Sequence, residues 1–387
     1  MTMKEVCSKE KCTGCLACYN ICHNEAIKLI QDSCGFIYPQ IDQSLCINCG
    51  MCAKVCHVNN YIPLKYPIDC YAATVKNNDE LRSCASGGIA TELSRYIINK
   101  GGIVYGCTGK DIRNVHHICI NSIKDLSVLK GSKYVQSYIG TTYKDIKNNL
   151  KKDISVMFIG TPCQVAGLRS YLKVEYENLI TVDIVCHGVP SQKMLNDNIN
   201  LYTKKDNDNI SVEFREKNRN GIKYGWYYKY PEISQIRKIK YYKDPYMFGF
   251  LRALTFRNSC YMCKYATISR CGDFTLCDFW GLGKDAGFNI NDGVSAVLIN
   301  TEKASRIWKQ ISCNTKCIKR EVVEAQMGNG QLQCPSRKHK NYNKFVLLYP
   351  KIGFDRAINK CIKTDIIKLF LNFILSYLRM MYRYISR

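Results

Sequence analysis

The chain has 387 residues, of which 46% are hydrophobic and 24 are cysteine, and its formal net charge is +24. This length allows a buried core and two or three domains. So many cysteines would suggest disulfides in a small secreted protein, but this chain is long and begins without the apolar run of a signal sequence. We therefore expect metal-binding or redox cysteines in a cytoplasmic, reducing environment.

The excess of basic residues leaves several kinds of partner open. A lysine-rich surface on a soluble protein is the simplest explanation, and acidic redox partners or anionic membranes are the sharper ones. No nucleic-acid-binding module is visible in the sequence, so we expect no nucleic-acid partner.

Two cysteine runs near the N-terminus repeat one spacing, with gaps of two, two and three residues. In such runs three thiolates hold one four-iron cluster and the fourth reaches the neighbouring cluster. The spacing predicts a first set of Cys12, Cys15, Cys18 and Cys56, and a second set of Cys22, Cys46, Cys49 and Cys52. Zinc also binds Cys-x-x-Cys pairs, but it does not require the third and fourth cysteines of each run.

The residues after the two runs depart from the usual pattern. His23 and His57 stand where proline usually follows the fourth cysteine. We expect this change to affect loop shape or reduction potential without removing a ligand.

Downstream of Pro67, strand-like and helix-like segments alternate. We expect strands at 71–75, 103–106, 155–159, 179–185 and 293–301, and helices at 89–99 and 165–172. The loops that follow these strands carry small residues and cysteines, and ligands bind at such strand ends in α/β folds. The polar segment 196–208 is expected to be exposed.

Cys260 and Cys263 form a further pair, which cannot complete a four-ligand site alone. Two sources could supply the missing thiolates: Cys271 and Cys277 nearby, or Cys163 and Cys186 at the distant strand ends. Spacing alone does not choose between them.

Several motifs between about Tyr71 and Thr301 resemble the coenzyme F-420 hydrogenase/dehydrogenase beta subunit family, the FrhB/FdhB-like iron–sulfur flavoproteins. The matching segments are ASGGI at 85–89, GSKYVQS at 131–137, GTPCQVAGL at 160–168, DIVCHGVPS at 183–191, SCYMC at 259–263, DFWG at 278–281 and GVS at 293–295. Together with the cysteine runs, this layout is similar to bacterial proteins often encoded near polysaccharide pyruvyl transferases.

The resemblance implies a third 4Fe-4S cluster and a bound FAD. It favours Cys163, Cys186, Cys260 and Cys263 as ligands of the third cluster. It also implies flavin contacts from two segments, comprising Ser86, Gly87, Gly88, Ser132, Lys133, Tyr134, Gln136 and Ser137. Electrons would pass between a one-electron carrier and a two-electron substrate, because a flavin supports both regimes.

Two function classes follow from this resemblance. The first is an iron–sulfur flavoenzyme that takes electrons from a ferredoxin-type donor and reduces a small molecule, such as an intermediate of polysaccharide biosynthesis. The second is a non-catalytic electron-transfer subunit that serves a separate catalytic partner. His187 and Asp278 are the weak candidates for catalytic residues, since an ordinary loop role explains His187 better and Asp278 at least as well.

The expected fold class is α+β, with four regions. A ferredoxin-like domain at 1–62 precedes a mixed α/β flavin-binding core, whose two parts span 63–150 and 151–334. A basic amphipathic tail at 335–387 ends the chain. Its segment 365–387 has the pattern of a helix that lies on a partner, on the inner membrane face or on its own core.

Overall fold

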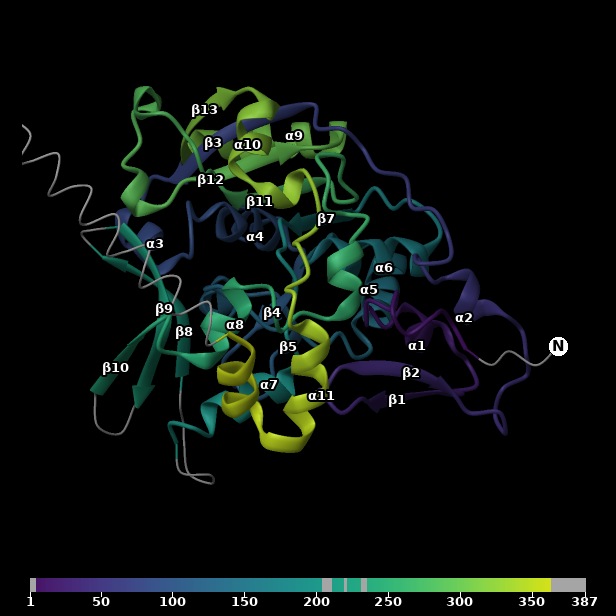
Figure 1. Cartoon of the computed structure of the whole chain (residues 1–387). Helices are drawn as coiled ribbons and strands as arrows, with labels where there is room; N and C mark the ends of the chain where they lie inside the picture. Colours follow the sequence, from purple (N-terminus) through teal and green to yellow (C-terminus); the bar gives the residue numbers. More distant parts are fainter. Residues whose placement is uncertain (1–4, 204–210, 219–220, 231–234, 363–387) are drawn as a thin grey trace, which may run out of the picture.

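The computed structural model describes residues 5–203, 211–218, 221–230 and 235–362 (Figure 1). Its N-terminal region contains two short helices and one antiparallel hairpin: α1 (Ala17–Ile21), β1 (Ile27–Gln31), β2 (Ile37–Ile41) and α2 (Met51–Lys54). Gly14 and Gly50 adopt left-handed backbone conformations inside the two cysteine loops, where a β-carbon would be strained. The region has the ferredoxin-like form that the cysteine runs predict.

An eight-stranded mixed sheet forms the core of the remaining chain. Its order is β13-β3-β12-β11-β7-β6-β4-β5. The strands are β3 (Asp69–Val75), β4 (Ile103–Thr108), β5 (His116–Ile120), β6 (Val156–Gly160), β7 (Leu179–Ile184), β11 (Phe274–Asp278), β12 (Ser295–Ile299) and β13 (Thr315–Arg320). Strands β11, β7, β6 and β4 are mutually parallel, and β3 shares their direction because both β3 and β11 are antiparallel to β12.

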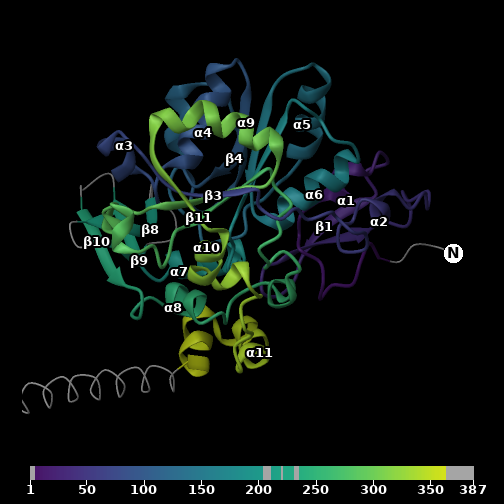
Figure 2. The same cartoon turned by 90° about the horizontal axis from the view of Figure 1, so that it is seen from above.

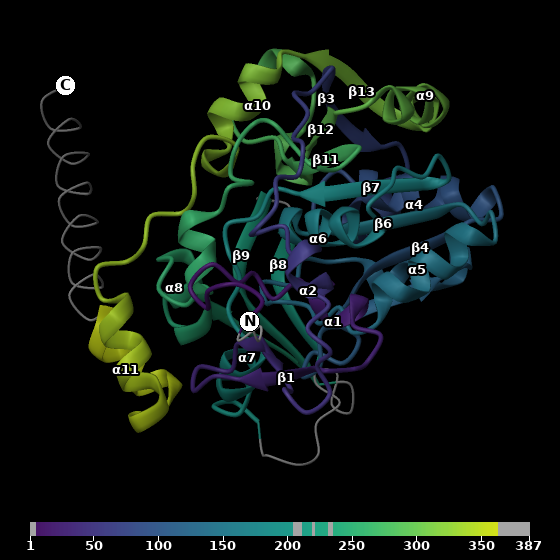
Figure 3. The same ribbon diagram turned by 90° about the vertical axis from the view of Figure 1, so that its right-hand side faces the viewer.

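Helices cover both faces of this sheet because its central strands are apolar on both sides. Helices α4 (Ile89–Asn99) and α9 (Glu302–Ile311) pack on one face (Figure 2). Helices α5 (Thr142–Lys151) and α6 (Pro162–Leu172) pack on the other, and α1 of the ferredoxin-like region lies against them (Figure 3). The ferredoxin-like region is therefore docked on the α5–α6 face of the core.

Smaller elements complete the described chain. A three-stranded sheet contains β8 (Ser211–Asn218), β9 (Gly221–Tyr230) and β10 (Gln235–Lys240). The remaining helices are α3 (Asn78–Ser83), α7 (Gln192–Ile199), α8 (Pro245–Leu251), α10 (Val322–Gly328) and α11 (Tyr342–Ile352). Short 3-10 helices include Asn258–Met262, which carries the Cys260 loop.

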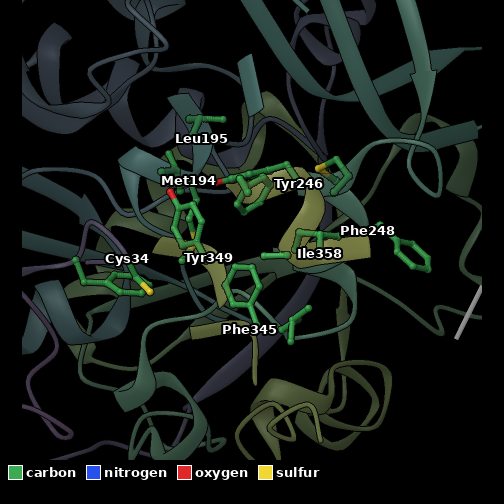
Figure 4. Close-up of a cluster of buried hydrophobic side chains, with 14 of the residues drawn as sticks. Cys34, Met194, Leu195, Tyr246, Phe248, Phe345, Tyr349 and Ile358 are labelled. Carbon is green, nitrogen blue, oxygen red and sulfur yellow. The ribbon is translucent and has the colours of Figure 1, made fainter. Parts of the chain in front are cut away.

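A buried cluster joins the end of the described chain to its beginning. Helix α11 and the helical residues 354–362 contribute Phe345, Tyr349 and Ile358, which pack with Phe36 of the ferredoxin-like hairpin and Met194 of α7 (Figure 4). The first part of the predicted tail is thus packed on the protein's own core. The segment 365–387 lies outside the described residues.

None of the helices among the described residues has the length and apolar character needed to cross a membrane.

The expectation that 196–208 is exposed is wrong for its first residues. Asn198 and Ile199 are fully buried in α7. The Asn198 side-chain amide donates a hydrogen bond to Asp244 Oδ2 at 2.9 Å, and the Tyr202 hydroxyl donates to the same oxygen at 3.2 Å. The polar residues of this segment predicted exposure, but the Asn198 and Tyr202 side chains form hydrogen bonds with the buried Asp244 carboxyl group instead.

This buried carboxyl group predicts a specific pH dependence of stability. Burial raises the pKa of Asp244 to about 6, above the value near 4 of an unfolded aspartate. The folded state then binds the proton more tightly, so this group's contribution to stability falls as pH rises from about 4 to about 6, by roughly 3 kcal/mol.

The comparison with Asp244→Asn isolates this effect. We expect the difference in unfolding free energy, wild type minus variant, to fall across that pH window and to stay constant above it. Urea unfolding at stepped pH measures the difference, and a difference independent of pH would contradict the assignment.

Candidate functional site: three cysteine sets

The first predicted cysteine set lies together. Cys12, Cys15, Cys18 and Cys56 line one small cavity, although Cys56 comes from the second run. This is the crossed arrangement that the spacing predicts. A fifth cysteine, Cys7, lines the same cavity, and its hydrogen bonds lower the pKa of Cys12 to about 6 and that of Cys56 to about 7.

The second set is closer to solvent. Cys22, Cys46 and Cys52 interact electrostatically and border one small hydrophobic cluster. Cys49 lies in the same loop with an exposed side chain. The backbone N–H of Ala26 donates to Cys22 Sγ at 3.3 Å. The structure therefore gathers three members of this set and leaves the fourth at the surface.

The third set is drawn from three separate parts of the core. Cys163 is the second residue of α6, Cys186 follows β7, and Cys260 and Cys263 lie in and after the 3-10 helix at 258–262. All four line one cavity of about 370 Å³. Cys271 instead donates a hydrogen bond to Pro162 O at 3.2 Å, and Cys277 packs beside another hydrophobic cluster.

The surroundings of the third set suit a bound iron–sulfur cluster. Burial raises the pKa of Cys163 to about 11 and that of Cys186 to about 12, and it also raises the pKa values of Cys260 and Cys263. Free thiolates are therefore disfavoured in this cavity, whereas metal coordination deprotonates a thiol and balances its charge. Four soft sulfur donors around a partly apolar cavity fit a 4Fe-4S cluster.

Within the described ranges, no group of three or more His, Cys, Asp or Glu side chains is arranged to hold a single metal ion. The sulfurs that ligate a four-iron cluster surround a larger body than one ion, so the two cavities describe these cysteine sets more directly.

His57 connects the first and third sets. It follows Cys56 directly, is fully buried and lines the third cavity together with Thr13. Its Nε2 lies 3.0 Å from Thr13 Oγ1, and its Nδ1 lies 2.7 Å from the Tyr265 hydroxyl. Burial lowers its pKa to about 3, so the imidazole is neutral. A proline at this position could make neither side-chain contact, which gives the departure from the usual motif a structural reason.

A second close approach joins the same two sets. Cys15 lies directly against Gly167 of α6, the helix that begins near Cys163. A β-carbon added to Gly167 would stand 2.9 Å from Cys15 Cβ and 3.0 Å from Cys15 Sγ. Only glycine allows this approach of the ferredoxin-like loop to α6.

The substitution Gly167→Ala tests this contact. Alanine normally stabilises a helix interior by about 1 kcal/mol relative to glycine. Here we expect a net loss of roughly 1–2 kcal/mol, because the added methyl group overpacks the contact with Cys15. Thermal unfolding under anaerobic conditions measures the change. Gly330→Ala, where an added β-carbon meets no atom within 4 Å, is the control, and a Gly167→Ala variant as stable as wild type would refute the contact.

The residues predicted to bind flavin are placed in two groups. Ser86, Gly87 and Gly88 precede α4, where Ser86 Oγ donates to Val294 O at 3.2 Å and Gly87 packs closely on the Ala73 carbonyl. The segment from Ser132 to Ser137 follows the 3-10 helix at 123–129.

Several side chains of the second group are engaged within the protein. Lys133 Nζ donates to two backbone carbonyls, those of Leu129 and Lys130, at 2.8 Å each. Gln136 Nε2 donates to Thr13 O at 2.9 Å, and Ser137 Oγ lies 3.0 Å from His117 Nδ1. Tyr134 stacks on Phe250 with ring centroids 4.7 Å apart.

His187 and Asp278, the candidate catalytic residues, lie at the carboxyl ends of the neighbouring parallel strands β7 and β11. His187 lines the third cavity, and although burial lowers its pKa, the Asp278 carboxylate opposes that shift. Asp278 Oδ2 forms an ion pair with Arg215 Nη2 at 3.0 Å. Burial raises the pKa of Tyr134, which also interacts with Arg215 and Asp278.

One edge of the large sheet therefore gathers predicted residues from four of its strands. The carboxyl ends of β3, β6, β7 and β11 are followed by Ser86, Cys163, Cys186 and, at the last residue of β11, Asp278. Ligands bind at this edge in open α/β sheets. The sequence did not predict roles for Cys7, Arg257 and Tyr265. The one signal near them was His57, which stands where proline is usual and contacts Tyr265.

Comparisons with known proteins agree with the two-part layout. Residues 11–60 match the family model of the 4Fe-4S dicluster domain, and residues 153–325 match that of the C terminus of the coenzyme F420 hydrogenase/dehydrogenase beta subunit. No curated protein matches the chain. One similar solved structure is a chain from the xenon-derivatised F420-reducing NiFe hydrogenase complex of Methanosarcina barkeri. It shares 17% identity at a TM-score of 0.47, and the match covers 70% of this chain and 91% of that chain.

These matches confirm the resemblance drawn from the motifs. The chain is an iron–sulfur electron-transfer protein that is related to the beta subunits of F420 hydrogenases and dehydrogenases.

Proposed function

We propose that this relative of F420 hydrogenase and dehydrogenase beta subunits is an oxidoreductase. It would carry electrons from a ferredoxin-type donor through three 4Fe-4S clusters to a flavin and a small-molecule acceptor. The observation that carries the proposal is the third cavity. Cysteines from three core segments line it together with Thr13 and His57 of the ferredoxin-like region. When bound, the clusters would relay single electrons and the flavin would exchange one or two.

The exposure of the three cysteine sets indicates the order in which electrons would pass through them. The second set is the most exposed, since Cys49 lies at the surface, and it would face the external redox partner. All four cysteines of the first set are buried, and Cys15 packs against α6. The third set lies within the α/β core. The first set, rather than the second, is therefore the neighbour of the third.

The two-electron site is proposed beside the third cavity, at the carboxyl edge of the sheet. His187 lines that cavity and interacts electrostatically with Asp278, and Asp278 and its ion-pair partner Arg215 in turn interact with Tyr134. Ser86, Gly87 and Gly88 lie at the same edge; the Gly87 N–H already donates to Ser295 Oγ at 3.0 Å, so Ser86 and Gly88 would supply the backbone contacts to a flavin phosphate. Burial lowers the pKa of His187 and the Asp278 carboxylate opposes that shift, so its ring would hydrogen-bond the acceptor or donate a proton to it as the flavin reduces it.

A second function is favoured by the hydrogen bonds of the other flavin segment. Lys133, Gln136 and Ser137 already bond to protein groups. If those bonds persist, the chain would be an electron-transfer subunit whose catalytic partner holds the two-electron site.

Anaerobic titration with FAD separates the two functions. We expect the reconstituted protein to bind FAD stoichiometrically and to reduce it when a reduced ferredoxin is supplied, since its clusters would pass on the electrons. Cluster reduction without any flavin binding would instead identify an electron carrier. A role with a sugar-linked substrate of polysaccharide synthesis is tested by whether such compounds reoxidise the reduced flavin.

A further inference from the structure

Cys7 belongs to no predicted ligand set, yet it lines the same cavity as the first set. Its side chain packs against the hydrophobic cluster that contains Cys12 and against the one that contains Cys18 and Cys56. Five cysteines therefore surround a space for which four ligands suffice.

The backbone holds Cys7 in this position. The neighbouring Val6 is buried, and its carbonyl accepts a hydrogen bond from Asn59 Nδ2 at 2.8 Å. The backbone N–H of Asn59 in turn donates to Cys56 O at 3.0 Å. On the other side, the backbone N–H of Cys12 donates to Ser8 O at 3.0 Å. The Cys7 segment is thus tied to the loops of both Cys12 and Cys56.

We propose that Cys7 is a reserve ligand of the first cluster, able to replace either Cys12 or Cys56. The inference rests on the ligand set assigned to that cluster. In the exchange, the bond between iron and the departing sulfur breaks, and a bond between iron and Cys7 Sγ forms. The Cys7 proton passes to the departing thiolate. No electron is gained or lost, so the exchange requires no oxidant or reductant.

Such a ligand would protect the first cluster, which would link the cluster of the second set to that of the third. A thiolate lost to oxidation, or displaced when the loop opens, would be replaced before iron escapes. Cys15 offers the matched contrast, because it packs against Gly167 of α6 in a different part of the core.

The test uses alanine variants of the full chain, reconstituted anaerobically with iron and sulfide. We expect Cys12→Ala and Cys56→Ala to keep the iron content of the wild type. Adding Cys7→Ala to either one should remove about one iron and produce the electron paramagnetic resonance signal of an oxidised three-iron cluster. Cys15→Ala should lose iron whether or not Cys7 is present. Identical iron content and spectra for Cys56→Ala and its Cys7→Ala double variant would overturn the proposal.

A second measurement covers the case in which those variants do not fold. Cys7→Ala alone should assemble the same amount of iron as the wild type. During controlled oxidation with ferricyanide it should form the three-iron species several-fold faster, and equal rates would overturn the proposal. The iron content of the wild type separately reports whether the proposed clusters exist, so the two failures are distinguishable.

Discussion

Replacing Cys260 by alanine should remove the third cluster and leave the two clusters of the ferredoxin-like region. The expected change is a loss of about four irons and four sulfides per chain. Cys260 is half-buried beside Cys163, Cys186 and Cys263, and among the described residues no fifth cysteine lines this cavity to replace its sulfur. Reduction of bound flavin by ferredoxin should fall by orders of magnitude, because the ferredoxin-like region would lose its connection to the core.

Cys277→Ala provides the matched control for this experiment. Cys277 is close to Cys260 in the sequence and partly buried, but it packs beside the hydrophobic cluster that contains Cys70. Its variant should retain all irons and the rate of flavin reduction. An unchanged iron content in Cys260→Ala, or a loss of four irons in Cys277→Ala, would contradict this ligand set. The second result would favour Cys271 and Cys277 as ligands.

Arg257→Ala should strongly destabilise the docking of the ferredoxin-like region on the core. Arg257 is about 1% exposed, and it donates to Gln136 Oε1 at 3.0 Å, Cys12 O at 3.2 Å and Ile37 O at 2.8 Å. Its guanidinium also lies over the rings of Phe36 and Tyr38. Loss of these bonds leaves buried acceptors without donors, which costs about 3 kcal/mol or more.

Arg257 also positions the third set. Its backbone N–H donates to Val189 O at 2.9 Å, and its carbonyl accepts a hydrogen bond from the backbone N–H of Cys260 at 3.0 Å. One residue therefore holds the Cys12 loop and the Cys260 loop together. Arg257→Lys keeps the charge but loses the planar fork, so we expect it to be intermediate in stability.

Thermal unfolding and limited proteolysis of the anaerobic protein measure this effect. The exposed Arg306, whose side chain is 62% accessible, supplies a control, since Arg306→Ala should change stability by less than about 0.5 kcal/mol. An Arg257→Ala variant that resists protease as the wild type does would show that other contacts hold the two regions together.

The strongest sequence signals were local and chemical. The cysteine spacing predicted the crossed sharing of Cys56 with the first set, because the ligand geometry of a two-cluster domain is encoded in short gaps. Strand and helix positions such as 89–99 were also predicted, because the apolar period of a helix is visible in a single chain.

The parts that sequence reasoning missed depend on contacts between distant segments. Cys260 alone could not choose between its local and distant partners, and Arg257 carries no motif that marks it as an anchor. Asn198 was expected at the surface because its partner Asp244 is 46 residues away. These relations arise only when the ferredoxin-like region packs on α6 and the strand ends of the core meet.

The central claim is that three clusters and a flavin site share one chain, and chemical analysis of the anaerobically purified protein tests it most directly. We predict about twelve irons, about twelve acid-labile sulfides and one bound FAD per chain. About eight irons with no flavin would contradict the claim, because the chain would then contain only the ferredoxin-like clusters.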